Sequence, residues 1–146
     1  MMKNEIGYDE CSAYQVSIYC GRRVGYTDEI LPLSIVERIC DEFVNDEKYC
    51  VTITETQFKY VNGSEPGVIV GLIKYPRFPK KPDVIRSLAD KLARKLLIGM
   101  KQIRVSVATL TTTFMLTNMN LERKYSPNDE QMSQINNKKT KSDNVN

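Results

Sequence analysis

The chain has 146 residues, which suits one compact domain and is too short for a two-domain enzyme. Hydrophobic residues make up 41% and charged residues 27%, so there is enough apolar material for a packed core. Lysine and arginine number 21 against 18 acidic residues, a weak excess that argues against a nucleic-acid partner. The sequence has no histidine, so the commonest general base and zinc ligand is missing.

The four cysteines form no CxxC pair, which argues against a zinc site. In a reducing compartment we expect Cys20, Cys40 and Cys50 to be small buried side chains. The first fourteen residues carry charges and lack the apolar region of a secretory signal. The longest apolar run, residues 67–73, is far shorter than the roughly 20 residues that span a bilayer. We therefore expect a cytoplasmic protein with no membrane partner, no metal and no cofactor.

The first part of the chain alternates between strand and helix patterns. Apolar residues at every second position predict a strand over residues 14–20, followed by a loop with two glycines at 21–26. Apolar residues at helical spacing predict a helix over residues 34–46. Ser34 stands three residues before Glu37, the spacing of a capping box at the start of that helix.

The middle of the chain predicts a hairpin. Residues 50–60 alternate again and include several threonines, as in a half-buried strand. Asn62-Gly63 is a strong turn signal, although residues 64–67 favour a loop of more than two residues. Residues 68–73 are apolar at both parities, which is typical of a central strand.

The second half predicts one more helix and two more strands. Three prolines exclude regular structure over residues 75–82, and strong helical periodicity follows over 83–98. Alternation then predicts strands at 103–107 and 112–117. The order is that of a ferredoxin-like α+β sandwich, with an antiparallel sheet, two helices on one face and an added C-terminal hairpin strand.

This fold would occupy residues 1–121 as a single domain. Residues 122–146 are polar, with few apolar side chains and nearly balanced charges. They bury too little surface to offset the entropy of ordering them. We predict a flexible, disordered C-terminal tail.

One candidate site comes from the expected sheet. If right-handed crossovers make the strands at 14–20 and 68–73 parallel neighbours, the loops at 21–26 and 74–81 share one rim. Neither loop has an acidic residue, and both mix cations with aromatic rings, which suits an anionic, phosphorylated or nucleotide-like ligand. The predicted ligand-binding residues are Arg22, Arg23, Tyr26, Tyr75, Arg77, Phe78, Lys80 and Lys81.

A structural interpretation of the same residues stays open. The arginines can be solvated, Tyr75 and Phe78 can close the end of the core, and the prolines can stiffen a connection. Neither loop carries the glycine pattern of a known phosphate-binding fingerprint.

The sheet face away from the helices is a candidate interface. It is expected to be polar at its margins and apolar at its centre, and a monomer would leave that centre exposed. We expect a homodimer or higher homo-oligomer to cover it, with a protein partner as the alternative. RNA recognition would need more aromatic side chains there. The predicted interface residues are Ser17, Tyr19, Thr52, Thr54, Ile69, Ile73 and Arg104.

Three classes of function remain. The leading hypothesis is a non-catalytic binding protein that captures an anionic ligand at the basic and aromatic rim. The alternative is a protein-protein interaction module, an inhibitor or adaptor, acting through the open sheet face or the sheet edges. An enzyme that works without histidine comes third, because the topology places no two carboxylates in an evident facing pair.

Overall fold

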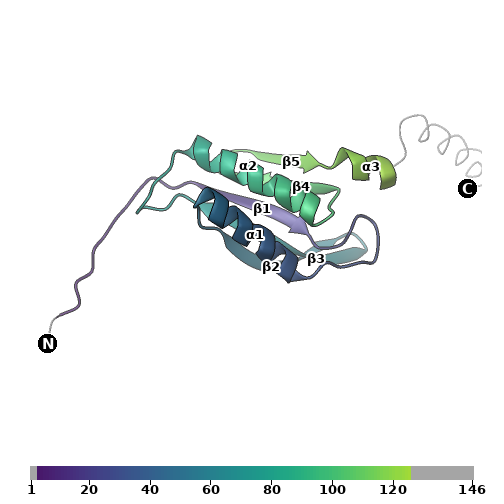
Figure 1. The fold of residues 1–146 in the computed structure, drawn as a ribbon, viewed down its shortest axis with the longest axis horizontal. Coiled ribbons are helices and arrows are strands. Elements are labelled where there is room, and N and C mark those ends of the chain that lie inside the picture. The colour runs from purple at the N-terminus through teal and green to yellow at the C-terminus, as the bar shows by residue number, and fades with distance from the viewer. Residues whose placement is uncertain (1–2, 126–146) are drawn as a thin grey trace, which may run out of the picture.

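The computed structural model describes residues 3–125, which form one sheet, two long helices and a short third helix (Figure 1). The strands are β1 (Gln15–Gly21), β2 (Thr52–Tyr60), β3 (Gly63–Ile73), β4 (Arg104–Ala108) and β5 (Thr113–Thr117). The helices are α1 (Leu33–Glu47), α2 (Pro82–Gly99) and α3 (Met119–Tyr125). Within these residues, no helix is long and apolar enough to cross a membrane.

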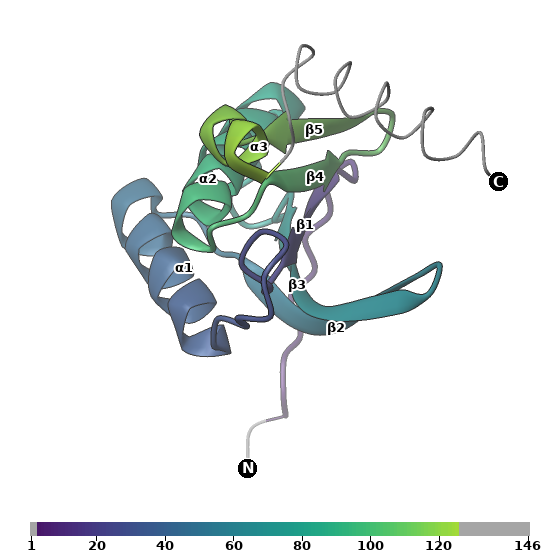
Figure 2. The same ribbon diagram turned by 90° about the vertical axis from the view of Figure 1, so that its right-hand side faces the viewer.

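The strands form one antiparallel sheet in the order β2-β3-β1-β4-β5. Helices α1 and α2 lie side by side on one face of this sheet (Figure 2). The predicted ferredoxin-like α+β class is confirmed, including the extra strand β5 at the edge.

The core lies between the sheet and the two helices, as the apolar periodicities indicate. In β1, Val16 and Ile18 are buried while Gln15 and Tyr19 are exposed. Phe43 of α1 is the largest of the fully buried side chains. Helix α2 buries its predicted face completely or nearly so, through Ile85, Leu88, Leu92 and Leu96.

Two local predictions were wrong. Helix α1 begins after Pro32 with no side-chain cap, so Ser34 and Glu37 form no capping box. The hairpin has a two-residue turn instead of a longer loop, since Tyr60 pairs with Gly63 and Asn62 has a φ of 61°. Pro66 lies within β3 and faces Gln57 of β2. It does not interrupt the sheet, because the pairing of β3 with β1 begins only at Gly67.

The predicted tail begins inside a helix. Residues 122–125 are the last part of α3, where Glu122 forms an ion pair with Arg104 at 3.0 Å. The remainder of the predicted tail, residues 126–146, lies outside the described residues.

The predicted parallel pairing of the first and third strands was also wrong. β1 runs antiparallel to β3, with Gln15 opposite Ile73 and Gly21 opposite Gly67. The physical reason is that each crossover skips a strand, so β1 is parallel to β2 and β3 lies between them, antiparallel to both. The end of β1 and the end of β3 therefore lie at opposite ends of the sheet.

The sheet face away from the helices, which we call the open face, has the mixed character expected. Tyr19 is 37% and Ile73 41% exposed, while Ile69, which pairs with Tyr19, is half-buried. Arg104 is engaged by Glu122 of α3. A role of this face in self-association remains a prediction.

Candidate functional site

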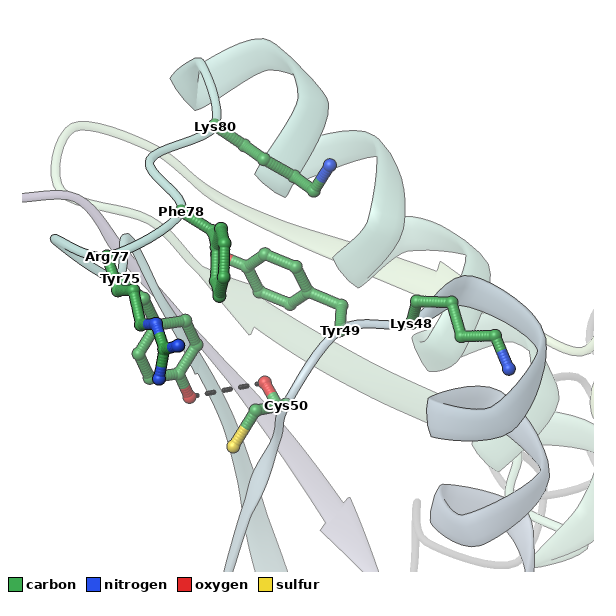
Figure 3. Close-up of a pocket in the computed structure, with 7 residues that line it drawn as sticks. All are labelled: Lys48, Tyr49, Cys50, Tyr75, Arg77, Phe78 and Lys80. Atoms are coloured by element: carbon green, nitrogen blue, oxygen red, sulfur yellow. Dashed lines mark hydrogen bonds between the residues drawn. The ribbon is translucent and has the colours of Figure 1, made fainter.

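A hollow of about 500 Å³ lies at the end of the sheet where β3 ends and β2 begins. We call it the aromatic-basic pocket. Its walls come from the α1-β2 connection and the β3-α2 connection, which are far apart in the sequence (Figure 3). The lining residues are Lys48, Tyr49, Cys50, Tyr75, Arg77, Phe78 and Lys80.

The hairpin places these two connections together. Thr52 pairs with Gly71, so the residues before β2 lie beside the residues after β3. Lys48 ends α1 in the left-handed conformation, with a φ of 55° and its N–H donated to the carbonyl of Val44. That turn redirects the chain, and Tyr49 packs into the core with 4% of its surface exposed.

Two tyrosines form the inner wall of the pocket. Their ring centroids lie 5.5 Å apart at an angle of 58°. The hydroxyl of Tyr49 donates to the carbonyl of Ile73, and that of Tyr75 donates to the carbonyl of Cys50 at 3.2 Å (Figure 3). Burial raises the pKa of both phenols above the ordinary value. Both phenols are therefore neutral hydrogen-bond donors at physiological pH.

The outer wall combines an exposed ring with cations. Phe78 is 68% exposed, and the guanidinium of Arg77 lies over its ring at 5.2 Å. Lys80 and Lys48 also line the pocket, and Figure 3 shows the Lys48 ammonium directed away from the rings. Among residues 3–125, the ion pairs do not involve any of these three cations. Their charge is therefore available to an anionic group.

Three of the predicted site residues lie at the other end of the sheet. Arg22 donates from Nε to the carbonyl of Leu31 at 3.0 Å. Tyr26 packs edge-on against Tyr125 of α3, with centroids 6.0 Å apart. The predicted single rim was therefore wrong, because it depended on the parallel pairing of β1 and β3.

Arg23 also lies at that end and is held by several groups. It donates to the carbonyls of Thr27 at 3.4 Å and Ser64 at 3.3 Å. Its guanidinium lies 3.7 Å from Asp28 and 3.9 Å from Glu65. These contacts tie the loop after β1 to the start of β3, which is a structural role.

Four of the eight predicted ligand-binding residues thus share one pocket: Tyr75, Arg77, Phe78 and Lys80. Lys81 directly precedes α2 as its N-cap residue. Lys48, Tyr49 and Cys50 were not among the predicted site residues. The signal was present in the predicted hairpin, because antiparallel pairing of 50–60 with 68–73 brings the start of one strand to the end of the other.

Comparisons with known proteins give a fold likeness. No family model and no curated protein matches the chain. A phage S-adenosylmethionine (SAM) lyase in complex with S-methyl-5'-thioadenosine is similar, with a TM-score of 0.59, 15% identity, and coverage of 78% of this chain and 96% of that one. The apo state of a phage SAM lyase gives 0.56, 13%, 80% and 96%. At these identities the likeness shows the fold alone.

Proposed function

We propose that the protein binds an adenosine derivative carrying an anionic group in the aromatic-basic pocket. The observation that carries this proposal is that three aromatic rings line one hollow of about 500 Å³ together with Arg77 and Lys80. That volume falls within the roughly 300–1,000 Å³ of small-molecule sites.

The two kinds of side chain suit two parts of such a ligand. A purine ring gains from stacking on an exposed aromatic face, and Phe78 offers one at the mouth of the pocket. A carboxylate or phosphate gains from the guanidinium of Arg77, which binds planar oxyanions through two parallel hydrogen bonds. The ammonium of Lys80 adds positive charge on the other side of Phe78 (Figure 3).

The similar SAM lyase supports the adenosine part of the proposal, because it was seen with S-methyl-5'-thioadenosine. SAM and S-methyl-5'-thioadenosine share the adenosine and a methylated 5' sulfur, which is a sulfonium in SAM and a neutral thioether in the thioadenosine. Only SAM carries a carboxylate, so loss of the Arg77 guanidinium should affect SAM and not the thioadenosine.

The test is calorimetric titration with SAM, S-methyl-5'-thioadenosine and ATP. We expect Phe78→Ala to weaken binding of all three, and Arg77→Ala to weaken SAM and ATP by about tenfold, the equivalent of about 1.4 kcal/mol, while sparing the uncharged thioadenosine. Arg86→Ala is the matched control, because Arg86 lies over Phe114 at 5.0 Å in the same type of contact outside the pocket. Absence of binding by all three compounds at about 1 mM overturns the proposal.

A second candidate function is cleavage of SAM. The fold likeness that covers 96% of a SAM lyase favours it. Release of S-methyl-5'-thioadenosine from SAM breaks the bond between the sulfur and the aminobutyrate chain, and the sulfonium keeps the electron pair and becomes a neutral thioether. The carbon that loses the sulfur bonds to the carboxylate oxygen of the same chain, which closes a lactone. The thioether leaving group needs no proton, so a sequence without histidine is compatible with the reaction.

Chromatography of SAM incubated with the protein tests this second function. We expect S-methyl-5'-thioadenosine to form in proportion to protein concentration, and Arg77→Ala to slow its formation where Arg86→Ala does not. Binding of SAM without any turnover would leave the protein as a binder alone.

A further inference from the structure

The segment ahead of β1 leaves the domain as an extended arm. Residues 3–11, which we call the leading arm, contain no helix or strand and run away from the rest of the domain in both views (Figures 1 and 2). Ile6 is 92% and Tyr8 82% exposed. Exposed apolar side chains do not add to the stability of the domain, because they are not removed from water. Two of them close together in the sequence indicate a contact surface for another molecule.

The root of the arm is fixed beside the aromatic-basic pocket. Lys74 donates from Nζ to the hydroxyl of Ser12 at 2.8 Å, and its N–H donates to the carbonyl of Tyr14. The thiol of Cys11 lies 3.8 Å from the carbonyl of Lys74. These contacts hold the chain next to the residue that precedes Tyr75 and direct the arm outward.

The arm and the pocket are complementary in both charge and polarity. The arm carries Glu5, Asp9 and Glu10 against a single lysine, Lys3. The pocket presents Arg77 and Lys80, and its ring of Phe78 is 68% exposed. Acidic side chains beside an apolar pair thus match cations beside an exposed ring.

We propose that the leading arm of one chain docks over the aromatic-basic pocket of a second copy, with Ile6 and Tyr8 covering Phe78 and the acidic residues facing Arg77 and Lys80. A second copy is the occupant because the arm is anchored at Ser12 and points away from its own pocket. Only Asp9, Glu10 and Cys11 separate Tyr8 from that anchor, and the Cys11 thiol is itself held at the carbonyl of Lys74. The docked arm would use the same ring and cations as the proposed ligand, so the arm and the ligand would exclude each other from the pocket.

Charge exchange between two variants tests this arrangement. One variant reverses the arm, Asp9→Lys with Glu10→Lys, and the other reverses the pocket, Arg77→Glu with Lys80→Glu. We expect the unmodified chain to self-associate at micromolar concentration, and each variant alone to dissociate with an affinity at least about tenfold weaker. An equimolar mixture regains the association, because the basic arm meets the acidic pocket and the acidic arm meets the basic pocket.

Sedimentation velocity measures these states, and circular dichroism verifies the fold of each variant. Arg86→Glu with Lys95→Glu is the matched control, since it makes the same charge change on α2 outside the pocket. Ile6→Ser with Tyr8→Ser is a second test without any charge change, and we expect it to weaken association as well.

A monomeric unmodified chain, or association that ignores all of these substitutions, overturns the proposal. Because the readout is mass in the absence of ligand, its failure is distinct from a failure of adenosine binding. A chain that binds SAM as a monomer would retain the proposed function and lose only the arm contact.

Discussion

The two ends of the sheet carry similar residues and use them differently. At the end where β1 stops, Arg22 and Arg23 donate to backbone carbonyls, and Arg23 lies near two carboxylates. At the end where β3 stops, Arg77 stacks on an exposed ring and has no ion pair within residues 3–125. A basic loop residue is therefore a binding candidate only where the fold leaves its charge without a partner.

The end of the sheet where β1 stops, which we call the bonded end, has one buried polar atom without a partner among the described residues. The Nε atom of Arg23 is buried and has no hydrogen-bond partner among the described residues. Glu65 lies 3.9 Å away, beyond hydrogen-bond distance. The surrounding carbonyls nevertheless fix the guanidinium in place, so we treat this end as support for the loop between β1 and α1.

The cysteines should show the largest difference between the two ends. Cys20, at the end of β1, is fully buried, and burial with the nearby Glu65 raises its pKa to about 12. Cys50, in the pocket, was predicted to be buried and is exposed. We expect iodoacetamide to modify Cys50 at least about 100-fold faster than Cys20, because the thiolate is the reactive form.

Mass spectrometry of peptides from the labelled protein measures both rates. Cys40 is an internal control, since it is buried and has a pKa raised to about 11 by burial. A bound ligand should slow the labelling of Cys50 only. Equal labelling of Cys20 and Cys50 in the folded protein would mean that the structure around the end of β1 unfolds locally and exposes Cys20.

The second largest effect should follow from Gln102→Leu. Gln102 is 6% exposed and donates from Nε2 to the carbonyls of Arg23 at 2.7 Å and Met100 at 2.9 Å. Leucine keeps the volume but leaves both carbonyls without this donor, which should cost about 2–3 kcal/mol of unfolding free energy. Urea unfolding measures the loss, and ligand affinity of the folded variant should not change. A parallel loss of affinity would show that the two ends are coupled.

The sequence was sufficient for the fold class because its signals agree with one another. Helical periodicity over 83–98 and alternation over 14–20 each reflect which side chains are buried, and burial is what these patterns record. The hydrophobic periodicity of a strand does not indicate whether its neighbours run parallel or antiparallel to it. Strand directions follow from pairing between distant segments, and one wrong parallel assignment moved Arg22, Arg23 and Tyr26 to the wrong end.

The pocket was half predictable for the same reason. The segment from Tyr75 to Lys81 has a visible mixture of rings and cations, so it was found. Tyr49 looks like an ordinary residue between a helix and a strand, and its role depends on the register of Thr52 with Gly71. Short-range patterns do not contain that register, although the Asn62-Gly63 turn indicated the hairpin that produces it.

The pocket tyrosines should give a smaller effect than Gln102. Tyr49→Phe removes a donor to the Ile73 carbonyl from a ring that is 4% exposed, which should cost about 1–2 kcal/mol. Tyr75→Phe removes a 3.2 Å bond to Cys50 from a more accessible site and should cost about 0.5–1 kcal/mol. Urea unfolding measures the loss of unfolding free energy in each variant. A larger loss for Tyr75→Phe than for Tyr49→Phe would mean that Tyr75 stabilises this end of the sheet more than Tyr49 does.

The smallest effect concerns Glu65, at the bonded end. Burial raises the pKa of this carboxyl above the usual value, and the charge of Arg23 lowers it by less. A raised pKa in the folded state means that the protein folds more favourably with this carboxyl protonated. The contribution of Glu65 to stability is therefore fully present below the unfolded pKa of 4.5 and is lost as the pH rises through the folded pKa. Glu65→Gln remains neutral throughout. We expect it to match the unmodified protein near about pH 4 and to exceed it slightly near about pH 7 in thermal unfolding. If the variant is instead the less stable one at neutral pH, the attraction between Glu65 and Arg23 outweighs the cost of burying the carboxylate, and the bonded end is held by charge as well as by its backbone carbonyls.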